Sequence, residues 1–140
     1  ALRTNSAGHK TTLSWAHALA DADSEITLVG ATWIAGGLGH EADGECSPVH
    51  GAQLMAWTGL GWEALESTTA APDAPDKMAW STDDPETLDR LLFGLPGTET
   101  LNFAVTPTAP NGCGPEYGQV TTDYVEVTVG YRLPAELPLE

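Results

Sequence analysis

Residues 120–133 read VTTDYVEVTVGYRL, and this stretch decides the fold. Two sets of residues alternate along it: Val125, Val127, Val129 and Tyr131 in one set, and Tyr124, Glu126, Thr128 and Arg132 in the other. Successive side chains of a β-strand point to opposite faces, so the alternation predicts a strand with one buried face and one solvated face. Residues 99–106 repeat the pattern, with Leu101, Phe103 and Val105 on the apolar face. Half-buried strands of this kind are typical of antiparallel sheets.

Five earlier segments also carry strand patterns: residues 11–15, 25–34, 52–57, 62–66 and 77–81. The second of them is apolar on both faces, which predicts a central strand. Its expected faces are Ile26, Leu28, Thr32 and Ile34 on one side, and Val29 and Trp33 on the other. Residues 58–61, Thr-Gly-Leu-Gly, fit the link of a hairpin between the third and fourth segments.

One short helix is predicted after these five segments. Asp84 is a suitable N-cap residue, and Pro85 suits the first helical position because the amide hydrogen that proline lacks has no partner there. Apolar residues then follow at helical spacing and a glycine ends the pattern: Leu88, Leu91, Leu92 and Gly94.

Together these elements indicate an all-β fold, an antiparallel two-sheet β-sandwich of jelly-roll or immunoglobulin-like kind with one short helix. Long loops are expected at residues 35–51, 68–76 and 107–118, and loops on a rigid β framework are where recognition is usually placed. We expect a single domain, residues 11–140. Residues 1–10 are polar and are expected to form an N-terminal arm that is either flexible or docked on a neighbouring subunit.

The charge of the chain excludes several classes of partner. Five Lys and Arg residues stand against 20 Asp and Glu, which gives a formal net charge of −15. Nucleic acids and anionic membranes are bound through basic surfaces, so neither is an expected partner. Membrane insertion is not expected either, because the longest uncharged apolar stretch, residues 26–38, is shorter than the about 20 residues that a membrane helix needs.

Two loops hold the residues with cofactor or redox chemistry. Glu41, Asp43 and Glu45 alternate along the first loop, and oxygen ligands at this spacing would suit Ca²⁺, although a solvated acidic loop is the alternative. We expect no other cofactor. Cys46 and Cys113 are the only two cysteines, and their placement in loops favours a disulfide in an oxidising compartment over two free thiols.

Aromatic residues are the strongest candidates for binding. The chain has five tryptophans, and a tryptophan ring can stack on a sugar or anchor a protein interface. Trp15 and Trp33 lie within strand patterns and are expected in the core, whereas Trp80 is expected to cover the helix. The ligand-binding or interface candidates are those beside the hairpin link and in the third loop, namely Trp57, Trp62 and Tyr117, with packing of the two tryptophans on each other as the alternative.

Signals for catalysis are missing from the sequence. It has no GxSxG or SxxK motif, and Gly36-Gly37-Leu38-Gly39 lacks the lysine and helix of a phosphate-binding loop. A small hydrolase that uses carboxylates or His40 and His50 is therefore the weakest of the functions we consider. We expect a protein that is not an enzyme.

The segment TTLSWAH, residues 11–17, followed by ITLVG, residues 26–30, resembles the opening of small β-sandwich domains of bacterial surface proteins and phage virion appendages. The resemblance implies a non-enzymatic module for display or attachment. We therefore expect a structural or adhesive subunit of an exposed assembly, such as a virion decoration or tail protein or a cell-surface filament, located outside the cell or on a virion. Its expected partners are other protein subunits, as a homo-oligomer or lattice. The alternative is a carbohydrate-binding module that uses its loop tryptophans.

Overall fold

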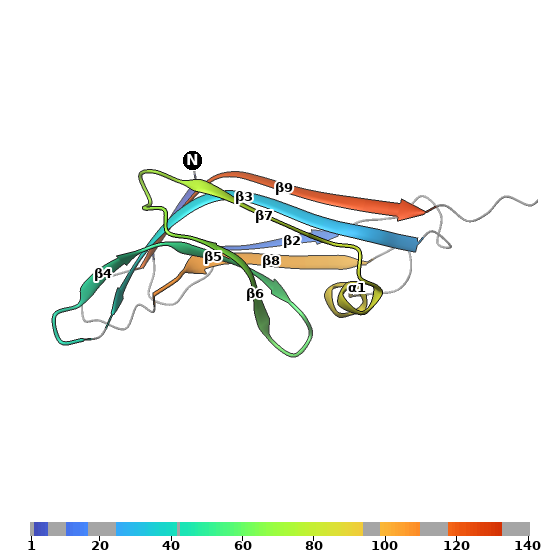
Figure 1. The fold of residues 1–140 in the computed structure, drawn as a ribbon, viewed down its shortest axis with the longest axis horizontal. Coiled ribbons are helices and arrows are strands. Elements are labelled where there is room, and N and C mark those ends of the chain that lie inside the picture. Colours follow the sequence, from blue (N-terminus) through green and yellow to red (C-terminus); the bar gives the residue numbers. More distant parts are fainter. Residues whose placement is uncertain are drawn as a thin grey trace, which may run out of the picture.

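The computed structural model describes residues 2–5, 11–16, 25–41, 43–93, 99–109 and 118–132. Within these ranges, nine strands and one helix form two antiparallel sheets that stack on each other (Figure 1). The predicted all-β, two-sheet architecture with one short helix is therefore confirmed. No helix in the described part of the chain is long and apolar enough to cross a membrane.

The first sheet has five strands and the second has four. The first sheet has the order β1 (Leu2–Asn5), β9 (Gln119–Arg132), β3 (Glu25–Glu41) and β4 (Ser47–His50), and β7 (Asp76–Thr82) also pairs with β3. The second sheet has the order β2 (Thr11–Ala16), β8 (Thr100–Pro107), β5 (Ala52–Trp57) and β6 (Trp62–Thr68). The helix α1 (Pro85–Leu91) lies at one end of the sandwich (Figure 1).

Strand β3 is central, as predicted, but it is longer than its sequence pattern indicates. It continues through residues 35–41, and β4 follows at 47–50, where a loop is expected. The three glycines there are explained by close backbone approaches. A Cβ on Gly36, Gly37 or Gly39 would lie only 2.0, 2.1 or 2.3 Å from a carbonyl oxygen, that of Ala71, Gly51 or Ala109 respectively. Glycine inside a strand permits another backbone to come this close. These three glycines therefore indicate where other segments of the chain pass against β3, and they do not indicate a loop.

A β-bulge changes the expected faces of β3. The β3–β9 register shifts between Ile26 and Leu28, and an extra residue in one strand reverses the side on which every preceding side chain lies. Ile26 therefore belongs to the core together with Val29, and not to the face of Leu28 as the alternation predicts. A second shift lies between Ile34 and Ala35.

The core between the sheets contains the apolar face predicted for β8 and most of the face predicted for β9. Leu101, Phe103 and Val105 are buried. Val125, Val127 and Val129 of β9 pack against the core, whereas Tyr131, expected on the same face, is 46% exposed. Trp33 is also in the core, as predicted, and its Nε1 donates a hydrogen bond of 3.0 Å to the hydroxyl of Thr122. The side chain of Trp15 lies outside the described part of the chain.

The N-terminal segment does not extend to a neighbour where it is described. Residues 2–5 form β1, an edge strand paired with β9 of the same chain, from Leu2 opposite Thr122 to Asn5 opposite Gln119. The expectation of a flexible arm or one docked on a neighbour is therefore wrong for residues 2–5, because these residues pair with β9 of their own sheet. The remaining residues of 1–10 lie outside the described residues.

The helix α1 begins as predicted. The Asp84 carboxylate accepts hydrogen bonds from the Thr87 N–H, at 3.0 Å, and from the Thr87 hydroxyl, at 2.7 Å. Leu88 and Leu91 are buried against the sandwich, which fixes the helix at its end. The helix ends at Leu91, and the expected terminator Gly94 lies outside the described residues.

Candidate functional site

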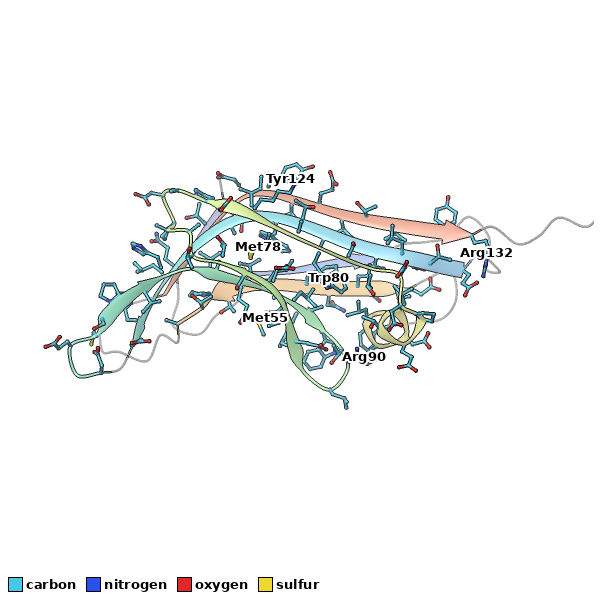
Figure 2. The ribbon with its side chains drawn as sticks, viewed as in Figure 1. Met55, Met78, Trp80, Arg90, Tyr124 and Arg132 are labelled. Atoms are coloured by element: carbon cyan, nitrogen blue, oxygen red, sulfur yellow. The ribbon has the colours of Figure 1, made fainter. Side chains whose placement is uncertain are left out.

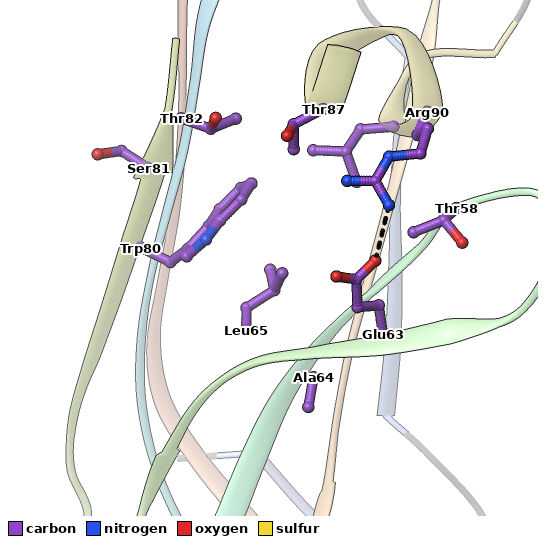
Figure 3. Close-up of a pocket in the computed structure, with 10 residues that line it drawn as sticks. Thr58, Glu63, Ala64, Leu65, Trp80, Ser81, Thr82, Thr87 and Arg90 are labelled. Atoms are coloured by element: carbon purple, nitrogen blue, oxygen red, sulfur yellow. Dashed lines mark hydrogen bonds and ion pairs between the residues drawn. The ribbon is translucent and has the colours of Figure 1, made fainter. Parts of the chain in front are cut away.

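A cleft opens where the edges of the two sheets part. Strands β6 and β7 are edge strands of different sheets, and they diverge towards α1, which fills the wide end of the wedge between them (Figure 3). The resulting cavity, which we call the α1 cleft, has a volume of about 240 Å³. Its apolar surface comes from Leu65, Trp80 and Leu91, and its polar surface includes Thr58, Glu63, Thr82, Thr87 and Arg90.

The position of Leu65 follows from a bulge in β6. Leu54 of β5 pairs with Glu66 and the next residue, Met55, pairs with Ala64, so Leu65 has no opposite residue on β5. The extra residue changes which face its side chain joins. Leu65 is consequently half-buried against the core, where it forms part of the cleft wall.

Trp80 is the aromatic residue of the cleft. Its ring centroid lies 6.5 Å from that of Phe103 at an interplanar angle of 64°, an edge-to-face contact with a buried ring. Such contacts favour one ring orientation. The indole is half-buried and projects into the cleft between β7 and Leu65 (Figure 3). Trp80 was expected to cover the helix, and it lines the same cavity as Thr87 and Leu91 of α1.

An ion pair bridges the helix and β6 at one side of the cleft. Nη1 of Arg90 lies 3.4 Å from Oε2 of Glu63, and each side chain is 52% exposed (Figure 3). Ion pairs this exposed contribute about 0–1 kcal/mol to stability, so the two groups can exchange partners at little cost. Arg90 is held in place by the capped helix. The Thr87 hydroxyl, followed by the Thr87 N–H, lowers the pKa of the capping Asp84 below its ordinary value.

The tryptophans picked from the sequence pack on each other. Trp57 and Trp62 are opposite residues of the β5–β6 hairpin, with ring centroids 5.6 Å apart at 66°. This is the packing alternative, and neither residue lines the α1 cleft, although their neighbours Thr58 and Glu63 do. Tyr117 lies outside the described residues.

The predicted Ca²⁺ site is not formed. The Asp43 carboxylate accepts hydrogen bonds from the Ser47 hydroxyl at 2.5 Å, the Glu45 N–H at 3.0 Å and the Ser47 N–H at 3.3 Å. The Ser47 hydroxyl makes the largest contribution to lowering the pKa of Asp43. The Asp43 carboxylate thus makes its hydrogen bonds within the β3–β4 turn. Among the described residues, which include Glu41 and Glu45, no group of three metal-ligating side chains occurs.

The remaining candidates lie near that turn. Cys46 is disulfide-bonded, and Cys113, the other cysteine of the sequence, lies outside the described residues. His40 is buried on β3, whereas His50 is exposed on β4. Neither histidine lines the α1 cleft, which of the groups named for the hydrolase alternative contains one carboxylate, that of Glu63.

A second depression lies on the outer face of the first sheet. It has a volume of about 320 Å³, and its surface comes from small and apolar residues of β3, β7 and β9, among them Gly30, Ala79 and Thr128. Trp80 lines this depression as well as the α1 cleft, but among the described residues no charged side chain does. The α1 cleft differs from it by the charged pair Arg90 and Glu63.

No family model, curated protein or solved structure matches this chain. Its function is accordingly inferred from the geometry of the α1 cleft.

Proposed function

We propose that this chain is a non-enzymatic adhesive module of an exposed assembly, at a cell surface or on a virion, and that it adheres by binding carbohydrate in the α1 cleft. The observation that supports this most directly is the position of Trp80. Its indole projects into a small cleft that also carries the Arg90–Glu63 ion pair.

Carbohydrates require this combination of groups. A sugar ring presents C–H groups that pack on an aromatic face, and hydroxyl groups that both donate and accept hydrogen bonds. The guanidinium of Arg90 supplies donors, the carboxylate of Glu63 supplies acceptors, and the hydroxyls of Thr58 and Thr87 supply both. Small-molecule sites are typically concave and apolar with a few polar groups that fix orientation, as in this cleft.

The experiment measures retention of the protein on a panel of immobilised neutral mono- and oligosaccharides, for the wild type and two arginine variants. Arg90→Ala is expected to weaken binding about tenfold or more, since a hydrogen bond to a charged group contributes about 1.5–3 kcal/mol. Arg132→Ala is the matched control, because Arg132 also forms an exposed ion pair, with Glu25, but does not line the cleft (Figure 2). Failure of every mono- and oligosaccharide to retain the wild type, or equal losses in both variants, would contradict the proposal.

A second candidate is attachment to protein subunits of the same assembly through the β5–β6 hairpin. Leu60 at its tip is 97% exposed, and the partly exposed Trp57 and Trp62 flank the link that forms this tip. Exposed apolar groups of this kind favour a protein contact. Sedimentation of the wild type and of Leu60→Ser tests it: a homo-oligomer that dissociates in the variant supports this candidate, and a wild-type monomer at high concentration counts against it.

A further inference from the structure

The α1 cleft is closed on three sides. On the first side, β6 and β7 converge towards residues 69–75, the segment that joins them. This segment is fixed against the first sheet, because the Gly37 N–H donates a hydrogen bond of 3.0 Å to the carbonyl of Ala70. The narrow end of the wedge is therefore held shut.

The second and third sides are closed by the helix and by the ion pair. Leu91 and Thr87 of α1 line the wide end, and the helix is anchored there by its buried leucines. The 3.4 Å contact between Arg90 and Glu63 then spans the gap from α1 to β6 (Figure 3). A polymer chain has no straight path through a cleft that is bounded in this way.

The volume sets the size of the ligand. Sites for drug-sized ligands measure roughly 300–1,000 Å³. At about 240 Å³ the α1 cleft is smaller. A cleft of this volume suits one sugar ring and is too small for several consecutive residues of a polysaccharide.

The charges of the cleft favour an uncharged ligand. Among the described residues, Arg90 is the only cationic one that lines the cleft, and its partner Glu63 lines it too. The chain as a whole carries a net charge of −15. A uronic or sialic acid would bring a second negative charge close to Glu63 and into this field, whereas a neutral sugar would not.

From this shape and charge, and resting on the proposed carbohydrate function, we infer that the α1 cleft holds a single neutral sugar ring at the end of a glycan chain or branch. Chain ends are therefore bound, and the interior of a polysaccharide is not. The Trp80 indole packs on the ring, and Arg90 and Glu63 bind its hydroxyls.

Isothermal titration of the full chain tests this inference with defined sugars. The probes are the di-, tetra- and hexasaccharides of a glucan, a mannan, a galactan and chitin, with glucuronic acid and glucose as a charged and neutral pair. We expect one protein molecule per chain and a Kd that changes by no more than about twofold from the disaccharide to the hexasaccharide. Glucose is expected to bind more tightly than glucuronic acid.

Two outcomes would overturn the inference while leaving the proposed function intact. One is a Kd that falls about tenfold or more with length, which indicates a groove for chain interiors. The other is tighter binding of glucuronic acid than of glucose. Lack of binding to every probe would instead contradict carbohydrate binding itself. Arg132→Ala, with wild-type affinity expected, controls for general effects of removing a surface arginine.

Discussion

Trp33 and Thr122 are 89 residues apart in the sequence, and a buried hydrogen bond of 3.0 Å joins the indole Nε1 to the threonine hydroxyl. The next residue, Thr121, is also buried, but its hydroxyl has no hydrogen-bond partner among the described residues. Two adjacent threonines of β9 thus differ in whether their hydroxyls are satisfied. The energetic consequences should be opposite.

Thr122→Val is expected to destabilise the fold by about 1–3 kcal/mol, because it leaves the buried Trp33 N–H without an acceptor. Thr121→Val changes the side-chain shape in nearly the same way but removes a hydroxyl that has no hydrogen-bond partner among the described residues. It is therefore expected to leave the free energy of unfolding unchanged or to raise it. Urea denaturation of both variants measures the free energies of unfolding. Equal losses in the two would show that the Trp33–Thr122 bond has no special role.

Gly36→Ala is expected to destabilise the protein by about 3 kcal/mol or more, near the upper end of overpacking costs, because its Cβ would meet the backbone of Ala71. Gly30→Ala on the same strand is the control. Its Cβ would come no closer than 3.4 Å to any atom, and it is expected to change the free energy of unfolding by less than about 1 kcal/mol. Thermal denaturation followed by circular dichroism compares the two. A stable Gly36→Ala protein would contradict the crossing of backbones at β3.

Asp84→Ala is expected to lower the midpoint of thermal unfolding at neutral pH. The pKa of Asp84 is lowered in the folded state, so its carboxylate stabilises the fold above its ordinary pKa, and this contribution is lost as the pH falls through the lowered value. The difference between wild type and variant should therefore shrink as the medium is acidified. Asp89→Ala removes an exposed carboxylate of the same helix that is not the cap, and it should change the midpoint less. A difference for Asp84→Ala that persists undiminished in acid would contradict the capping role.

Local patterns predicted a large part of this fold. The alternation in β8 and β9 needs no knowledge of distant residues, because one face of each strand meets the core and the other does not. The cap at Asp84 is similarly local, since it depends on residues three positions apart. These elements formed where the sequence indicated, within a residue or two at their ends.

The errors in the fold arose from long-range contacts. The glycine-rich composition of residues 36–39 is typical of a loop. These glycines lie in a strand because the backbones of distant residues, Ala71, Gly51 and Ala109, come close to them. The bulge near Ile26 is equally invisible in the sequence, because it depends on the register with β9.

The α1 cleft was missed for a related reason. Trp57 and Trp62 stand out beside a glycine-rich link, but they are cross-strand partners whose rings pack edge-to-face on each other. Trp80 and Arg90 lie on different elements, and Glu63 belongs to the other sheet. The one available signal was Arg90 itself, one of only five Lys and Arg residues in the chain, placed on a helix that follows closely after a tryptophan.

The tryptophan indole N–H resonances of the ¹⁵N-labelled protein report directly where a sugar binds. On addition of glucose, mannose, galactose or N-acetylglucosamine, the Trp80 resonance, assigned through Trp80→Phe, is expected to shift with at least one of these sugars, and the Trp57 and Trp62 resonances are expected to stay in place. Shifts confined to Trp57 and Trp62, or no shift with any of the four sugars, would contradict carbohydrate binding in the α1 cleft.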